Sequence, residues 1–250
     1  MRTVGVDLAA ADAATAVAVI DWIDGSAASL TSLRLGASDS DVVAAAHRAD
    51  RIGIDCALGW PDAFVAFVSG HADPVSAPAV DGGAGWRRGL VYRETDRVVR
   101  EVSGRWPLSV STDRLGVTAL RCAGLLSRLR EAGKDVDRAG DGDIVEVYPG
   151  ASLRLWGLHV RGYRVDPAAR RPLLDGLRAA APWLDLGDAA ELMVRSGDAF
   201  DAVVAALATR AAAVGAVLAP SPTQREIARR EGWVALPTAP IDRLIEHPRS

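Results

Sequence analysis

The chain has 250 residues, of which 49% are hydrophobic and 24% charged, and its 29 basic and 32 acidic residues give a formal net charge of −3. This composition is typical of a globular protein with a sizeable core, and it excludes a disordered chain, a uniformly basic nucleic-acid coat and a strongly acidic tail. No apolar run approaches the ~18 residues of a membrane helix, and an acid comes as early as Asp7, so we expect neither a membrane span nor an export signal.

The inventory of side chains excludes several catalytic classes. Cys56 and Cys122 are too few for a disulfide framework or a zinc site, which favours a reducing cytoplasm. The only lysine, Lys134, precedes Asp135, so the chain has no P-loop. The sequence also lacks a His-Glu-x-x-His zinc motif and a Gly-x-Ser-x-Gly nucleophile elbow. Carboxylates are the well-placed chemical groups that remain.

The first sixty residues predict a small mixed sheet. Apolar runs at 2–8, 15–23 and 29–35 are separated by short breakers, which favours an antiparallel meander of three strands. A helix is expected over 38–49, with a serine or aspartate as its cap. The run at 51–57 is expected to be a fourth strand, parallel to an earlier one because it follows a helix.

The rest of the chain predicts further helices and strands around a stretch of different composition. Residues 59–142 are rich in Gly, Pro, Trp and Arg, and 151–187 favour no single element. Helices are expected at about 93–102, 116–131, 198–214 and 224–230, and strands at 144–148 and 232–236. The alanine and valine content of the helix at 198–214 indicates tight packing against the sheet.

Acids interrupt three of the expected strands. Asp7 in Val-Gly-Val-Asp and Asp55 in Ile-Gly-Ile-Asp each follow a glycine by two residues, and Glu146 lies within Ile-Val-Glu-Val-Tyr. If the first two strands are parallel neighbours, ~4.8 Å apart, the same register places Asp7 and Asp55 side by side. Buried carboxylates repel one another and are costly unless paired, and a divalent cation would supply the missing charge.

A second group of acids lies at the start of the helix near residue 198. Asp198 and Asp201 are three residues apart and therefore face the same way. Oxygen ligands without Cys or His select Mg²⁺ or Mn²⁺ over Zn²⁺, and two such ions suit hydrolysis of a phosphodiester. We therefore predict Asp7, Asp55 and Asp201 as metal ligands, with Glu146 and Asp198 as further catalytic residues.

Each of these acids also has a purely structural interpretation. Asp7 can end a strand, Asp55 can precede a loop, Glu146 can pair with an arginine, Asp198 can cap a helix, and Asp201 can be favoured by the helix dipole. The combined pattern, rather than any one acid, indicates a metal site.

The order of elements resembles the ribonuclease H fold, and several motifs resemble domain-of-unknown-function family 429, which is described as predicted nucleases of that fold. These motifs are Val-Gly-Val-Asp at 4–7, Ile-Gly-Ile-Asp-Cys-Ala-Leu-Gly-Trp-Pro at 52–61, Arg-Glu-Thr-Asp-Arg at 93–97, Val-Glu-Val-Tyr-Pro at 145–149, Asp-Ala-Phe-Asp-Ala at 198–202 and Glu-Gly-Trp-Val at 231–234. The resemblance implies an α/β fold with a mixed sheet in the order 3-2-1-4-5, flanked by helices. It also implies one domain over 1–250, with a helical insertion at about 61–142.

One departure from ribonuclease H proper concerns the metal ligands. That superfamily matches Asp7 on its first strand, and its Holliday-junction resolvase branch matches Asp198 and Asp201 on the closing helix. The first helix of this chain lacks the expected glutamate, so Asp55 or Glu146 has to substitute for it.

The insertion carries a local excess of positive charge. Residues 87–130 contain ten arginines and four acids, an excess of +6 that leaves −9 on the rest of the chain. Arginines bind phosphate oxygens bidentately, and Trp86, Tyr92 and Trp106 offer stacking surfaces for bases. The predicted substrate-binding residues are Arg87, Arg88, Arg93 and Arg97, the last two because they lie in a family motif. Pairing and solvation along a helix, as for Arg97 and Glu101, is the alternative.

Three functions fit these observations to different degrees. The favoured one is a Mg²⁺- or Mn²⁺-dependent nuclease or phosphodiesterase, with nucleic acid or another phosphodiester as its substrate. A non-catalytic binding or scaffold protein of the same fold would instead have its carboxylates neutralised by arginines. An actin-like or sugar-kinase-like phosphotransferase is the most distant alternative, because Leu8-Ala9-Ala10 stands where such proteins have a glycine-rich phosphate turn.

Overall fold

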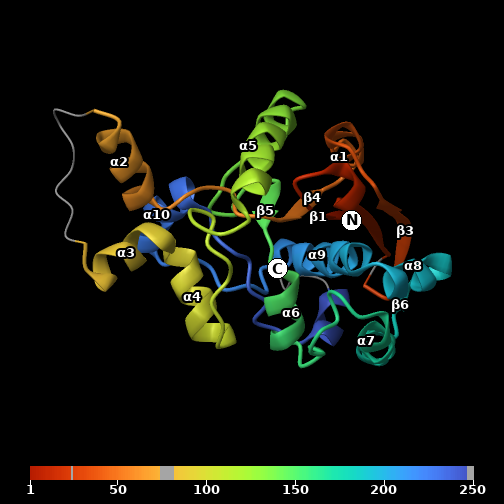
Figure 1. Ribbon diagram of the computed structural model, residues 1–250. Helices are drawn as coiled ribbons and strands as arrows, with labels where there is room; N and C mark the ends of the chain where they lie inside the picture. Colours follow the sequence, from red (N-terminus) through yellow and green to blue (C-terminus); the bar gives the residue numbers. More distant parts are fainter. Residues whose placement is uncertain (24, 74–81, 247–250) are drawn as a thin grey trace.

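A six-stranded mixed sheet forms the centre of the computed structural model, which describes residues 1–23, 25–73 and 82–246 (Figure 1). The strands are β1 Arg2–Asp7, β2 Ala16–Ile23, β3 Ala27–Leu35, β4 Arg51–Asp55, β5 Ile144–Glu146 and β6 Leu184–Asp185. Their order is β5-β4-β1-β2-β3-β6. The strand pairs β1–β2 and β2–β3 are antiparallel, whereas β4, β5 and β6 each pair in parallel with their neighbour.

This topology confirms the predicted order 3-2-1-4-5 and adds one strand to it. The added strand, β6, has two residues and lies in the stretch 151–187, where the sequence has no clear periodicity. The strand expected at 232–236 is not formed, and within this stretch only Val234 makes a bridge, an isolated one to Glu146. Gly232, with φ 95°, follows the end of α10, and the bridge of Val234 with Glu146 places this stretch next to β5.

Helices cover both faces of the sheet. The α-helices are α1 Asp39–Ala46, α2 Asp62–His71, α3 Ala84–Val91, α4 Glu94–Ser103, α5 Gly116–Glu131, α6 Pro149–Leu155, α7 Pro167–Ala180, α8 Ala190–Arg195, α9 Gly197–Ala213 and α10 Pro222–Glu231. Figure 1 shows α1 and α5 on one side of the sheet and α6, α7 and α9 on the other. Short 3₁₀ turns complete the described chain at Asp12–Ala14, Gly187–Ala189 and Ile241–Ile245.

The side chains of each strand alternate between two separate core clusters, as a period of two requires. Val4 and Val6 of β1 pack with Ile52 and Ile54 of β4 in the cluster under α1 and α5. The intervening positions of β1 and β4 face α9, which contacts β1, β2 and β4. This alternation decides which acids of the strands can meet.

Helix α9 is buried along nearly its whole length, as its alanine and valine content predicts. It begins at Gly197, and the Ser196 side chain caps it by accepting a hydrogen bond from the Ala199 backbone N–H at 3.1 Å. The interpretation of Asp198 as the cap of this helix is therefore wrong. Because Ser196 provides the cap, the Asp198 carboxylate is left to other contacts.

The stretch 61–142 contains α2, α3, α4 and α5, and its residues 74–81 lie outside the described part of the chain. Figure 1 shows α2, α3 and α4 with α10 beyond the β5 edge of the sheet. Helix α5 differs from them, because its Leu125 and Leu129 belong to the cluster on the sheet. In the described part of the chain, no helix has the length and apolar character needed to cross a bilayer.

Candidate metal centre

Asp7 and Asp55 end two neighbouring parallel strands at the same level. In the register of β1 and β4, Gly5 is the partner of Gly53, and Asp7 is the partner of Asp55. This is the arrangement that the repeated sequence predicts. Both carboxylates emerge at the carboxyl ends of their strands, where ligand sites of open α/β sheets usually lie.

The glycines two residues before these acids allow α9 to approach the sheet closely. A Cβ atom on Gly5 would collide with the α9 backbone at Ala202 and Ala206, and one on Gly53 would collide with the Thr209 hydroxyl. Because Gly5 and Asp7 share a face of β1, the face that admits α9 also carries the acid. Helix α9 thereby brings its own acid, Asp201, to the ends of the two strands.

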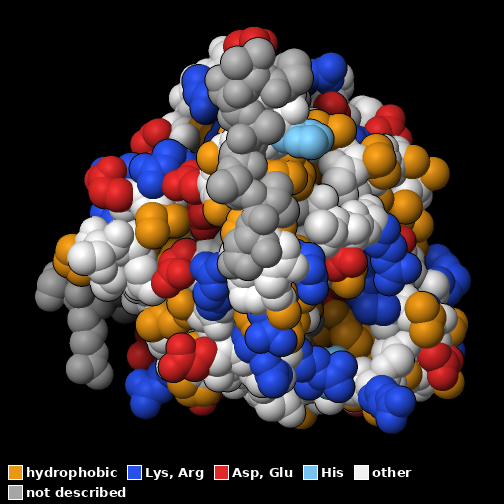
Figure 2. All heavy atoms as spheres, turned by 60° about the vertical axis from the view of Figure 1, so that its left-hand side comes forward, with side chains coloured by type: hydrophobic (Ala, Val, Ile, Leu, Met, Phe, Trp, Pro, Cys, Tyr) orange, Lys and Arg blue, Asp and Glu red, His pale blue; other side chains and the backbone are white. Residues whose placement is uncertain are grey.

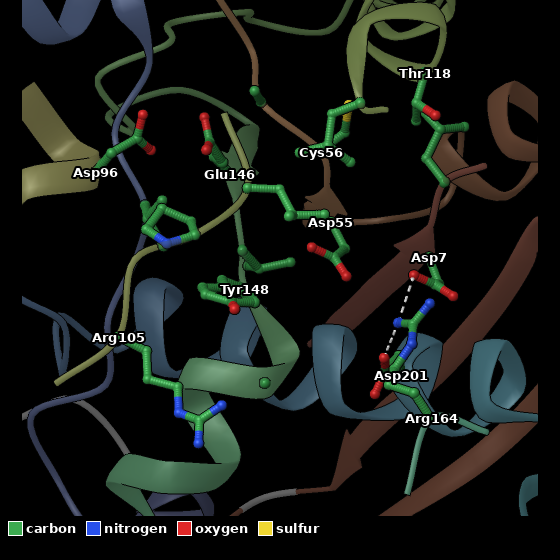
Figure 3. Close-up of a pocket in the computed structure, with 18 of the residues that line it drawn as sticks. Asp7, Asp55, Cys56, Asp96, Arg105, Thr118, Glu146, Tyr148, Arg164 and Asp201 are labelled. Carbon is green, nitrogen blue, oxygen red and sulfur yellow. Dashed lines mark hydrogen bonds and ion pairs between the residues drawn. The ribbon is translucent and has the colours of Figure 1, made fainter. Parts of the chain in front are cut away.

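The three acids form one compact group. Carboxylate oxygens of Asp7, Asp55 and Asp201 all lie within 4.8 Å of one another, and this trio of acids could hold a metal ion. Asp7 and Asp201 are buried, and Asp55 is half-buried. They line a cavity of about 640 Å³, and Figure 3 shows their carboxylates turned toward one another. The donor set contains only hard oxygen atoms, which suits Mg²⁺ or Mn²⁺.

Two residues from the loop between α6 and α7 contact the trio of acids. The guanidinium of Arg164 donates to Asp201, and it lies 3.5 Å from Asp7 Oδ1 and 3.4 Å from Asp198 Oδ1 (Figure 3). The Tyr163 hydroxyl donates to Asp201 Oδ1 at 2.9 Å. Arg164 thus supplies positive charge where three acids would otherwise repel one another.

The arrangement disfavours three simultaneous negative charges. Burial raises the pKa of Asp7 well above its usual range, and the charges of Asp55 and Asp201 add to this effect. Burial, together with the charge of Asp201, raises the pKa of Asp55 to about 7. Burial also raises the pKa of Asp201, against the opposing effects of Arg164 and Tyr163. A cation bound among these groups would replace the protons that the apo site retains.

The register of β5 keeps Glu146 out of this group. Glu146 is aligned with Ile54, not with Asp55, so its side chain leaves the sheet on the opposite face from the Asp55 carboxylate. Figure 3 shows it beside Asp96, on the far side of Asp55 from Asp7. The structure therefore does not bring the acids of all three strands together.

Glu146 is instead held by a buried arginine. Arg93 donates to Glu146 Oε1 at 2.7 Å and to Oε2 at 2.8 Å, and the Leu58 backbone N–H donates to Oε2 at 3.0 Å. Arg93 also donates to Asp96 Oδ1 at 2.9 Å and to the Glu231 carbonyl at 3.0 Å. This is the arginine pairing that the structural interpretation of Glu146 anticipates.

Asp198 lies at the edge of the trio. It is in the first turn of α9, its side chain is 35% exposed, and its contact within the site is the one with Arg164. Its charge raises the pKa of both Asp7 and Asp201, which shows that it is close enough to act on them.

The predicted substrate-binding arginines lie in different places. Arg93 lines the cavity, but its guanidinium is committed to Glu146, Asp96 and Glu231. Arg97 is exposed and pairs with Glu94 at 3.3 Å. Arg87 and Arg88 are exposed on α3 and do not line the cavity. Figure 2 views the molecule with the side that carries α2, α3 and α4 turned forward. It shows basic side chains among acidic ones, most densely in the lower part of the view, where they border a hollow.

Other basic residues line the cavity. They are Arg105, Arg114, Arg154 and Arg164. Within the described part of the chain, the side chains of Arg105 and Arg114 make no hydrogen bond or ion pair, and Arg154 contacts the His159 ring at 2.7 Å. Sequence reasoning missed Arg154, Tyr163 and Arg164 because they lie in the stretch 151–187, which carries no motif. Arg105 and Arg114, in contrast, lie within 87–130, the stretch whose excess of arginine predicts substrate contacts.

Comparison with known proteins gives one match. The family model described as protein of unknown function (DUF429) matches residues 5–225, which include all five predicted acids. No curated protein and no solved structure matches the chain.

Proposed function

The chain belongs to the family described as protein of unknown function (DUF429), and we propose that it is a metal-dependent nuclease or phosphodiesterase that hydrolyses phosphodiester bonds of nucleic acid. One observation carries this proposal: carboxylates from β1, β4 and α9 converge within 4.8 Å in a cavity that arginines also line. The same chain thus offers a cation site and an anion site side by side.

The residues fit a hard divalent cation. Asp7, Asp55 and Asp201 would hold it, and Asp198 would complete a second position at the edge of the trio. Two Mg²⁺ or Mn²⁺ ions would supply activation of a water molecule and stabilisation of the leaving oxygen. The raised pKa values of the three acids support this fit, because burial and mutual repulsion disfavour their charged forms and a bound cation would offset both effects.

The surrounding residues would orient the ligands and the substrate. Tyr163 donates to Asp201 Oδ1 and Arg164 donates to Oδ2, and together they hold the carboxylate in one orientation toward the other two acids. Arg105 and Arg114 are available to phosphate oxygens because no acid in the described chain neutralises them. Glu146 would not be a metal ligand, because Arg93 donates to both of its oxygens, and it would influence Asp55 only through its charge.

We propose in addition that residues 61–142 form a cover on this site within a single domain over 1–250. Arg105, Arg114, Leu115 and Thr118 of that stretch line the cavity together with the strand acids. The two cysteines are free and buried, which suits the reducing cytoplasm that we expect for this protein.

A cleavage assay tests the proposed activity. Labelled single- and double-stranded DNA and RNA are incubated with the protein in Mg²⁺, in Mn²⁺ or in a chelator. We expect cleavage that requires the metal and that is lost in Asp7→Asn. Cleavage in the chelator, or cleavage that survives Asp7→Asn, would contradict the mechanism.

Arg164 favours a second candidate function, a non-catalytic binding or scaffold protein of the same fold. Its guanidinium already neutralises Asp7, Asp198 and Asp201, as this alternative requires. The alternative predicts weak or absent binding of Mn²⁺ by the wild-type protein. Calorimetric titration with Mn²⁺ distinguishes the two functions.

A further inference from the structure

An aromatic pair lies at the edge of the cavity that holds the trio of acids. The rings of Tyr92 and Trp106 stack with their centroids 4.1 Å apart and their planes inclined by 23°. Trp106 lines the cavity and is 43% exposed, whereas Tyr92 is half-buried and does not line the cavity. An exposed indole ring that lines a cavity offers a flat surface on which a planar ligand can stack.

Hydrogen bonds anchor the segment that carries Trp106. Ser109, which is buried, donates from its hydroxyl to the Val91 carbonyl at 2.7 Å. The Ser109 backbone N–H donates to Asp113 Oδ2 at 2.7 Å, and the Ser103 hydroxyl donates to the Val99 carbonyl at 2.7 Å. The aromatic pair is therefore held in place before a ligand arrives, which lowers the entropic cost of binding.

An unpaired cation adjoins the aromatic pair. Arg105 precedes Trp106 in the chain, lines the same cavity and makes no side-chain hydrogen bond or ion pair among the described residues. Figure 3 shows its guanidinium at the lower left of the view, with Asp7 and Asp201 on the opposite side at the right. The cavity is thus lined by an exposed aromatic ring, an arginine without an acidic partner among the described residues, and a cluster of acids.

We infer that the site takes a nucleotide with an unpaired base, which stacks on Trp106 while its phosphate is bound by Arg105 on the side of the trio of acids. This inference rests on the proposed function and deepens it, because it selects single-stranded nucleic acid as the substrate class. A cavity of about 640 Å³ has the size of a small-ligand site. Bases within a duplex are stacked on one another and reach such a surface only after flipping out.

Binding of single-stranded oligonucleotides with and without bases tests this inference. A labelled oligonucleotide of mixed sequence and one with the same backbone but abasic residues are titrated with the protein in Ca²⁺ buffer, and binding is followed by fluorescence anisotropy. We expect the oligonucleotide with bases to bind roughly tenfold more tightly or better. This preference is expected to disappear in Trp106→Ala and to return in Trp106→Phe.

Phe67→Ala is the matched control. Phe67 is a half-buried aromatic residue of α2 that packs against Trp86 and does not line the cavity, so its loss is expected to leave the preference for bases unchanged. Equal binding of the two oligonucleotides, no binding of either, or an unchanged preference in Trp106→Ala would overturn the inference. Failure of the proposed function would give a different result: the protein would still bind bases through Trp106 but would show no metal-dependent cleavage.

Discussion

Asp7 and Asp55 are direct partners in the register of two parallel strands, and each follows a glycine over which α9 packs. The relationship joins the fold to the site, because the close approach of α9 is what carries Asp201 to the two strand acids. The absence of side chains at Gly5 and Gly53 is therefore a requirement for the grouping of the three acids.

The glycines are expected to be intolerant of even a methyl group. In Gly5→Ala the new Cβ would overlap the α9 backbone, and we expect a loss of about 1–3 kcal/mol in the free energy of unfolding, measured by urea denaturation. Gly124→Ala is the control, because a Cβ at that position of α5 meets open space and improves helix propensity. Equal stability of Gly5→Ala and the wild type would show that the close contact between α9 and β1 does not depend on a glycine at this position.

Removal of the buried Arg93 is expected to lower the stability of the protein far more than removal of the exposed Arg97. Arg93→Ala leaves Glu146 and Asp96 buried without their cation, so we expect a loss of about 3–5 kcal/mol in stability. Arg97→Ala removes an exposed pair with Glu94 and is expected to cost less than about 1 kcal/mol. Chemical denaturation of both variants measures this difference, and similar losses would contradict the placement of Arg93 in a buried network.

Stability of the metal-free protein is expected to fall as the pH rises from about 4 to above 7. Burial raises the pKa of Asp55 to about 7 and also raises the pKa values of Asp7 and Asp201. A carboxyl with a raised pKa binds its proton more tightly in the folded state, so its contribution is complete below the unfolded value of ~4 and is lost above the folded value.

Thermal unfolding across this pH range, with and without Mn²⁺, measures the effect. We expect Mn²⁺ to raise the Tm at pH 8 and to have little effect at pH 5, where protons compete for the same oxygens. Each kcal/mol regained corresponds to about 2–4 °C in a protein of this size. In Asp55→Asn the dependence on pH is expected to flatten, and a wild-type Tm that rises with pH without metal would contradict the assignment.

Arg164 is expected to compete with the metal ion. In Arg164→Gln the guanidinium no longer neutralises Asp7 and Asp201, so the apo protein is expected to melt at a lower temperature and to bind Mn²⁺ more tightly. Titration calorimetry measures the affinity. Arg171→Gln, an exposed substitution on α7, is the control. Weaker Mn²⁺ binding in Arg164→Gln would show that Arg164 supports the metal instead of competing with it.

The local patterns of the sequence predict most of the sheet and name the three acids, Asp7, Asp55 and Asp201, that the structure brings together. The repeated Gly-x-Asp motif determines the shared register of β1 and β4, and the small residues of α9 determine its burial. Glu146 departs from this motif, because the residue two positions before it is Ile144 and not a glycine. In the register of β5, Glu146 is aligned with Ile54 and not with Asp55.

The contacts of the charged side chains could not be predicted in this way. Arg93 and Arg97 lie in one motif, and only the fold determines that one is buried against Glu146 and the other exposed. Arg164 comes from a loop without periodicity, and its position depends on the packing of that loop against Gly197. Long-range contacts of this kind leave no local pattern in one sequence.

Titration of the metal-free protein with Mn²⁺ tests the central claim most directly, with Asp7→Asn, Asp55→Asn and Asp201→Asn measured beside the wild type. Asp141→Asn, which removes an exposed carboxylate outside the site, is the control. We predict that the wild type and Asp141→Asn bind Mn²⁺ alike and that each of the other three variants loses the binding. A wild type that binds no Mn²⁺, or binding that persists in all three variants, would contradict the assignment of this trio of acids as a metal centre.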